Sequence, residues 1–189
     1  YIVIQMNRIA IDIDEVLVPF LKPMSKYHNK TINKSKYSYV YRDIFDISEE
    51  ESQKMVQEFY KSPNFRALEP IRGAQRAMYK IKRCSEKMYI VTGRQDISRK
   101  ETEAWIDTYF PNIFDDIILT NSYTPNEIHK ADICRALNIG LIIDDNKAIC
   151  DTCIENGVSA INFIGGDDEI YPWCEENEIS IKGWETLKV

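Results

Sequence analysis

Four acidic residues stand where buried segments of this chain are expected to end. Asp12 and Asp14 lie in the apolar run Ile9 to Val18, which we expect to be a buried strand, and Asp144 and Asp145 follow another short apolar segment. Desolvated like charges repel, so such a group persists when a cation, a shared proton or hydrogen bonds compensate it. A carboxylate can attack phosphorus and form an acyl phosphate, which divides a difficult displacement into two easier steps. The pattern therefore indicates phosphoryl-group chemistry, with Asp12 as the candidate nucleophile.

This chemistry would need a hard cation, because the phosphoryl oxygens would otherwise repel the nucleophile. We expect Mg²⁺ with oxygen ligands from Asp12 and from an acid of the later pair. A second carboxyl group must protonate the leaving alkoxide and later accept a proton from water, and Asp14 is the candidate general acid and base. Successive strand residues point to opposite sides, so Asp144 and Asp145 are expected to play unequal parts.

Residues that could bind phosphate follow in two places. Thr92 offers a hydroxyl group, and the Gly93 amide stands where a backbone donor can approach phosphate closely. Arg94 could bind phosphate or pair with a nearby acid. Lys130 is expected at the start of a helix, which is an unfavourable place for a cation and favours a functional role. We expect Lys130 to hold the phosphate beside the Asp12 carboxylate.

Alternating apolar and amphipathic segments must position these side chains. Besides the first run, strands are expected at 88–91, 117–119, 141–143 and 159–163, and helices at 73–85, 98–109, 130–137 and 148–156. The alternation predicts an α/β fold, a Rossmann-like parallel sheet with helices on both faces. In such a sheet, ligands bind beyond the carboxyl ends of the strands, near the point where the strand order reverses. We therefore expect the acids, the threonine and the lysine to meet there.

A segment rich in Tyr and Phe interrupts the alternation. Within it, Ser48 and Glu51 form a capping box that predicts a helix to about Lys61. We expect a small helical cap at 19–70, inserted after the first strand of a core domain made of residues 1–18 and 71–189.

Composition excludes some function classes. With 189 residues and 44% hydrophobic content, the chain suits one core domain plus an insertion, and its net charge of −6 disfavours binding to a nucleic-acid polymer. A small phosphorylated metabolite needs only a local positive site. No apolar run approaches the roughly 18 residues of a membrane span. Five scattered cysteines suit reduced thiols, and we expect the C-x-x-C at Cys150 and Cys153 to pack inside a helix. We expect a cytoplasmic monomer or homodimer without a membrane partner.

In order along the chain, Asp12-Ile-Asp-Glu-Val, Thr92-Gly-Arg, Lys130 and Asp144-Asp145 resemble the four motifs of the haloacid dehalogenase (HAD) superfamily of phosphohydrolases. The resemblance implies a first strand flanked by the second and fourth. It also implies Mg²⁺ bound by the Asp12 carboxylate, the Asp14 backbone carbonyl and Asp145. Asp144 would then bond toward Lys130 or a metal-bound water.

Other features are similar to the 5′(3′)-deoxyribonucleotidase family and its uncharacterised relatives: the small helical cap, Glu69-Pro-Ile-Arg-Gly-Ala, Thr102-Glu-Ala-Trp-Ile and Leu-Ile-Ile-Asp-Asp. Glu15 stands where a glycine often follows the second acid, and Thr-Gly-Arg replaces the Thr-Ser-Pro of the characterised nucleotidases. The resemblance implies a Mg²⁺-dependent phosphomonoesterase, with nucleoside monophosphates as candidate substrates. A phosphatase of another metabolite, such as a sugar phosphate, and a catalytically silent HAD-like binding protein are the alternatives.

Overall fold

A single parallel sheet forms the centre of the protein. The computed structural model describes residues 8–32, 40–166 and 169–187, so the parts of the expected core and cap at 1–7 and 33–39 lie outside the described residues. Within these ranges six strands pair in the order β3-β2-β1-β4-β5-β6, each parallel to its neighbours. They are β1 (Arg8–Ile11), β2 (Lys87–Thr92), β3 (Asp116–Leu119), β4 (Leu141–Asp144), β5 (Ser159–Gly165) and β6 (Ser180–Lys182). The prediction of a Rossmann-like α/β fold is confirmed.

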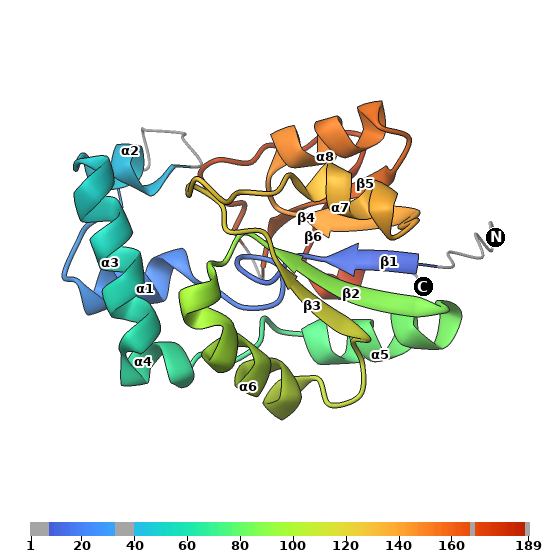
Figure 1. Cartoon of the computed structure of the whole chain (residues 1–189), viewed down its shortest axis with the longest axis horizontal. Coiled ribbons are helices and arrows are strands. Elements are labelled where there is room, and N and C mark those ends of the chain that lie inside the picture. Colours follow the sequence, from blue (N-terminus) through green and yellow to red (C-terminus); the bar gives the residue numbers. More distant parts are fainter. Residues whose placement is uncertain (1–7, 33–39, 167–168, 188–189) are drawn as a thin grey trace.

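Helices cover both faces of the sheet (Figure 1). On one side lie α5 (Ala74–Cys84) and α6 (Arg99–Tyr109), and on the other lie α7 (Lys130–Ala136) and α8 (Lys147–Glu155). Short 3₁₀ turns occupy Asp96–Ser98 and Trp184–Thr186. Among the described residues, none of the helices combines the length and apolar character that a membrane span requires.

The strand order reverses at β1, because β1 pairs with β2 on one side and with β4 on the other. Ile11 lies opposite Ile90 of β2 and Ile143 of β4. This central placement of the first strand agrees with the implication of the HAD resemblance. The groups that follow β1, β2 and β4 therefore emerge side by side at the carboxyl edge of the sheet.

The apolar run after Arg8 is not one long strand. Strand β1 ends at Ile11, and the carbonyl oxygen of Ile13 then accepts backbone N–H bonds from Val16, Leu17 and Val18 at 3.2, 2.7 and 3.1 Å. These three residues are fully buried in a compact loop. A continuous apolar run fits a buried strand and a tightly folded buried loop equally well, so the expectation of a strand to Val18 was wrong.

A separate group of helices lies beyond the carboxyl end of β1 (Figure 1). It comprises α1 (Leu21–Tyr27), α2 (Tyr41–Phe45), α3 (Glu49–Lys61) and α4 (Pro63–Arg66). The Phe20 ring lies 5.3 Å from Phe59 and 6.3 Å from Phe65, centre to centre, so aromatic rings build the interior of this group. The capping box of Ser48 and Glu51 opens α3 as the sequence predicts.

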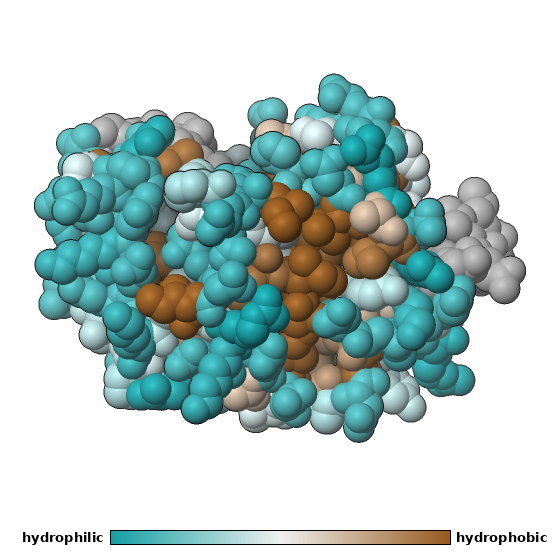
Figure 2. Space-filling view, viewed as in Figure 1, coloured by the Kyte–Doolittle hydropathy of each residue, from teal (hydrophilic) through white to brown (hydrophobic). Residues whose placement is uncertain are grey.

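One area of the sheet is incompletely covered. Figure 2 shows apolar side chains gathered over β2, β3 and α7. Tyr89, Ile118, Ile133 and Leu137 are partly buried and pack against an inner cluster that includes the buried thiols Cys150 and Cys153 of α8. The C-x-x-C pair therefore packs within a helix, as expected.

Candidate active site

Asp12 is the first residue beyond β1. Its backbone N–H donates to Ile143 O at 3.0 Å, which continues the pairing with β4 by one residue. One carboxylate oxygen, Oδ1, accepts from the Ile13 amide at 2.8 Å, and the other, Oδ2, lies 3.0 Å from Lys130 Nζ. The side chain is buried and its oxygens have fixed partners, so the candidate nucleophile is held in one orientation.

Lys130 bonds to the acids at the ends of β1 and β4. It begins α7, and its Nζ lies 2.7 Å from Asp144 Oδ2 as well as 3.0 Å from Asp12 Oδ2. The second Asp144 oxygen accepts the Asn146 amide at 2.9 Å. Two buried carboxylates therefore stabilise a cation at a helix start, where the helix dipole disfavours it.

Asp145 is fully buried, but only one of its two carboxylate oxygens has a hydrogen-bond partner. Its Oδ2 accepts a hydrogen bond from the indole N–H of Trp173 at 3.0 Å, whereas its Oδ1 has no hydrogen-bond partner. Carboxylate oxygens of Asp12, Asp144 and Asp145 lie within 4.8 Å of one another. Hard cations such as Mg²⁺ prefer carboxylate oxygens as ligands, and a buried oxygen without a partner is available for one. The residues therefore fit this ion.

The acidic cluster carries more negative charge than Lys130 neutralises. Burial raises the pKa of Asp12 to about 7, against the opposing effect of Lys130, and Asp144 adds to the rise. Burial also raises the pKa of Asp145 well above its ordinary value, with contributions from Asp144 and Asp12. For Lys130, burial acts to lower the pKa, but Asp12 and Asp144 outweigh it and raise the pKa. A cation in the cluster would relieve this repulsion.

The end of β2 supplies polar groups beside the cluster. Thr92 is fully buried, and its hydroxyl oxygen accepts the Arg94 amide at 3.3 Å. A Cβ atom at Gly93 would lie 3.1 Å from Ser122 Oγ, so a larger residue would crowd the next loop. A glycine here allows the backbone to stay close to that loop, and Gly93 lines the cavity over the site.

The Arg94 side chain turns toward Asp14. Its Nε donates to Asp14 Oδ2 at 2.9 Å, its Nη2 to Asp14 Oδ1 at 2.7 Å, and its Nη1 to Thr102 Oγ1 at 3.0 Å. The guanidinium carbon lies 4.8 Å from the centre of the Phe65 ring. Of the two roles considered for Arg94, the structure shows the pairing with an acid.

The contacts of Glu15 show why a residue other than glycine can stand at this position. Its φ angle of 60° is in the left-handed region that favours glycine. The Glu15 carboxylate compensates by accepting the backbone N–H groups of Phe20 and Leu21 at 2.9 and 2.6 Å, which fixes the entry into α1. Burial raises the pKa of this carboxyl group to about 7, although those amide bonds oppose the rise. Position 15 therefore ties the Asp14 loop to the helices beyond it.

A cavity of about 260 Å³ lies over the site. The sheet side contributes six of the candidate residues, including Arg94, and the helical group contributes polar and aromatic side chains. The cavity lining includes Asp12, Asp14, Thr92, Gly93, Arg94 and Lys130 from the sheet side and Tyr41, Gln53 and Tyr60 from the helical group. The structure thus brings every candidate site residue to one edge of the sheet, with Asp144 and Asp145 buried beside Asp12.

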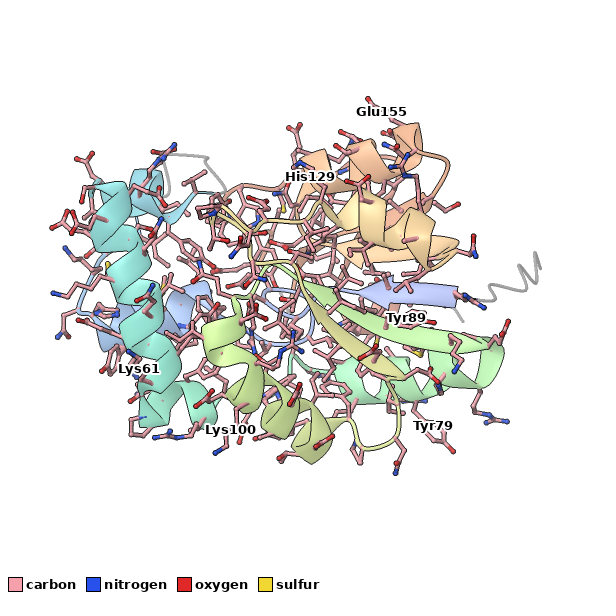
Figure 3. All side chains as sticks on the ribbon, viewed as in Figure 1. Lys61, Tyr79, Tyr89, Lys100, His129 and Glu155 are labelled. Carbon is pink, nitrogen blue, oxygen red and sulfur yellow. The ribbon has the colours of Figure 1, made fainter. Side chains whose placement is uncertain are left out.

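Trp173 was missed from the sequence. It lies on the segment between β5 and β6, where its ring stacks on Tyr171 at 5.1 Å, and the Tyr171 hydroxyl donates to Glu15 O at 2.7 Å. The only local signal is an aromatic pair after the last expected strand. Figure 3 shows many side chains at the carboxyl edge of the sheet. His129, just before α7, lies toward this edge, whereas Glu155, the last residue of α8, lies away from it.

Comparison with known proteins identifies the family. The model of the family described as 5′ nucleotidase, deoxy (pyrimidine), cytosolic type C protein matches residues 5–137, more than half of the chain. The chain belongs to this family. Membership in this nucleotidase family makes it a HAD-type phosphoric monoester hydrolase acting on small phosphorylated substrates, as the motifs predicted. The comparison with curated proteins gave no significant match.

Solved structures support the fold of this nucleotidase family member. A haloacid dehalogenase-like family hydrolase from Streptococcus pneumoniae has a TM-score of 0.61 at 16% identity, covering 84% of this chain and 85% of that chain. A predicted phosphatase from Clostridium acetobutylicum has a TM-score of 0.59 at 13% identity, covering 84% of each chain. A HAD-superfamily hydrolase from Ehrlichia chaffeensis has a TM-score of 0.53 at 15% identity, covering 94% and 92%. These similarities establish the HAD-like fold.

Proposed function

We propose that this chain is a Mg²⁺-dependent phosphomonoesterase that works through a phosphoryl group on Asp12, with nucleoside monophosphates as its substrates. The observation that carries the proposal is the buried acidic cluster. Three carboxylates lie within 4.8 Å, Lys130 bonds two of them, and Asp145 keeps one oxygen without a partner. Buried charge of this density is unfavourable in a purely structural role.

In the first step, an Asp12 carboxylate oxygen attacks the phosphorus and the bond to the leaving oxygen breaks. Asp14 gives a proton to that oxygen. Water then attacks the phosphorus of the acyl phosphate, Asp14 takes up its proton, and Asp12 is regenerated. The Thr92 hydroxyl, the Gly93 amide and Lys130 would hold the phosphoryl oxygens.

Mg²⁺ would be held by the Asp12 carboxylate, the Asp14 carbonyl oxygen and Asp145, with Asp144 orienting Lys130. When bound, this ion would neutralise repulsion between the nucleophile and the phosphoryl oxygens. The bond from Trp173 leaves Oδ1 of Asp145 as its unpartnered oxygen, which supports Asp145 as the direct ligand.

We further infer that residues 19–70 act as a cap on a core made of 1–18 and 71–189. Tyr41, Gln53 and Tyr60 line the same cavity as Asp12, which supports a substrate held between cap and core. A nucleoside could use the aromatic wall, because bases stack on aromatic rings. A compact metabolite phosphate is the second candidate, because about 260 Å³ is smaller than the roughly 300–1,000 Å³ of ordinary ligand sites.

Phosphate release from nucleoside monophosphates and hexose phosphates tests both candidates. We expect release in Mg²⁺ that stops in EDTA and in Asp12→Asn. Asp132→Asn, which removes an exposed acid on α7 paired with Arg135, is the matched control and should behave as the wild type. Turnover by Asp12→Asn, or equal turnover in EDTA, would contradict the mechanism. A preference for hexose phosphates would select the second candidate.

A further inference from the structure

Arg94 contacts the proposed acid and base, a helix of the core and the cap at once. Its guanidinium group donates to both oxygens of Asp14 and to the hydroxyl of Thr102 in α6, and it lies over the Phe65 ring of α4. The Arg94 side chain is 1% exposed, against 18% for Asp14. Both residues line the cavity, but the arginine side chain is almost fully enclosed, so the carboxylate is the more accessible partner.

A two-point bond between guanidinium and carboxylate fixes both the position and the plane of the carboxylate. Asp14 lies in the tight loop that follows β1, and without Arg94 its carboxyl group would be free to rotate about the side-chain bonds. Proton transfer needs the carboxyl oxygen within hydrogen-bond reach of the reacting oxygen. Rotation away from that oxygen would slow the steps that move a proton and spare those that do not.

Binding of phosphate by Arg94 would require it to leave these partners. The departure would separate a buried ion pair and expose the Asp14 charge without compensation, which is strongly unfavourable. Lys130, Thr92 and Gly93 already stand at the cavity to meet the phosphoryl oxygens. The contacts of Arg94 therefore favour action through Asp14 over direct binding of phosphate.

We propose that Arg94 is a positioning residue that orients the Asp14 carboxyl group toward the leaving oxygen in the first step and toward water in the second. In the first step, the proton occupies a carboxyl lone pair that the guanidinium leaves free. This role rests on the proposed phosphatase function.

Two substrates with different leaving groups test the role. An alkyl ester such as 2-glycerol phosphate needs its leaving oxygen protonated, whereas p-nitrophenol leaves p-nitrophenyl phosphate as a stable anion. In Arg94→Met, we expect kcat/KM for the alkyl ester to fall about 10²-fold and that for p-nitrophenyl phosphate to change less than about threefold. Asp14→Asn should show the same selectivity, and adding Arg94→Met to it should cause no further loss.

Controls separate this role from the alternatives. Arg99→Met removes a half-buried arginine of α6 that pairs with Asp96 and Glu103, and it should leave both rates unchanged. Thr102→Val keeps Arg94 but removes one of its partners. It should give a smaller loss, about 3–10-fold and again selective for the alkyl ester, even where Arg94→Met fails to fold.

Equal losses on both substrates, or a further loss when Arg94→Met is added to Asp14→Asn, would overturn the positioning role. A rise in the inhibition constant of inorganic phosphate with equal losses would assign Arg94 to phosphate binding instead. A wild type that releases no phosphate from either ester in Mg²⁺ would overturn the proposed function and this role together.

Discussion

Replacing Asp145 by asparagine should stabilise the protein in the absence of a divalent cation. The change removes one negative charge from three carboxylates whose oxygens lie within 4.8 Å. At an effective dielectric constant of about 20, two charges at that distance repel by roughly 3 kcal/mol. The side chain keeps its shape, an amide oxygen can still accept the Trp173 bond, and an amide N–H among carboxylates has acceptors nearby.

The gain should depend on pH with a definite sign. Burial and the neighbouring acids raise the pKa of Asp145 in the folded protein, so the folded state binds more protons than the unfolded state. The protonated Asp145 side chain therefore contributes fully to folding stability below its unfolded-state pKa, and this contribution is lost as pH rises through the folded-state pKa. Each pH unit above that value lowers the free energy of unfolding by up to about 1.4 kcal/mol while the folded carboxyl remains protonated. Asparagine does not titrate, so its advantage grows from pH 5 to pH 8.

Urea unfolding in EDTA and Mg²⁺ measures both effects. We expect Asp145→Asn to gain about 1–3 kcal/mol in EDTA at pH 8, less at pH 5, with a melting temperature raised by about 2–4 °C per kcal/mol. Mg²⁺ at 100 times its Kd should add about 2.7 kcal/mol to the wild type and much less to the variant. A variant that is less stable at both pH values in EDTA, yet is stabilised by Mg²⁺ as much as the wild type, would refute the reasoning. Asp132→Asn is again the surface control.

Two further variants test the groups around the cluster. Trp173→Phe keeps a ring on Tyr171 but removes the indole donor to Asp145, and it should weaken Mg²⁺ binding by about 10-fold in isothermal titration calorimetry; an unchanged Kd would show that the bond does not orient this ligand. Lys130→Met leaves two buried carboxylates without their cation, and urea unfolding in EDTA should show a loss of about 3–5 kcal/mol at pH 8. A loss below about 1 kcal/mol would mean that the pair contributes little to folding.

The sheet and most of the site follow from local sequence patterns. Short apolar segments separated by amphipathic ones predict β2 to β5 and their helices within one or two residues, and the largest difference is β5, which continues to Gly165. The polar residues at strand ends then define one edge, because parallel strands all place their carboxyl ends there. Asp12, Thr92 and Asp144 could be assigned to a common site from the sequence because each is the last residue of a strand or the first residue after one.

Features that depend on distant contacts could not be predicted in the same way. Trp173 acquires its role only through a hydrogen bond to Asp145, 28 residues away in sequence. The role of Arg94 depends on Asp14, 80 residues away, so the sequence left phosphate binding and acid pairing equally open. Strand β6 has three half-buried residues and no apolar run. In each case the deciding interaction is tertiary.

The loop that follows Asp12 is supported by the last third of the chain. The family match ends at residue 137, yet the Trp184 indole donates to Val16 O at 2.8 Å and the Tyr171 hydroxyl donates to Glu15 O at 2.7 Å. These bonds satisfy backbone carbonyls of a buried loop that forms no sheet pairing with β2 or β4 beyond Asp12. The position of Asp14 against Arg94 therefore depends on residues after β5, and variation in that segment would alter the site without changing any of the four motifs.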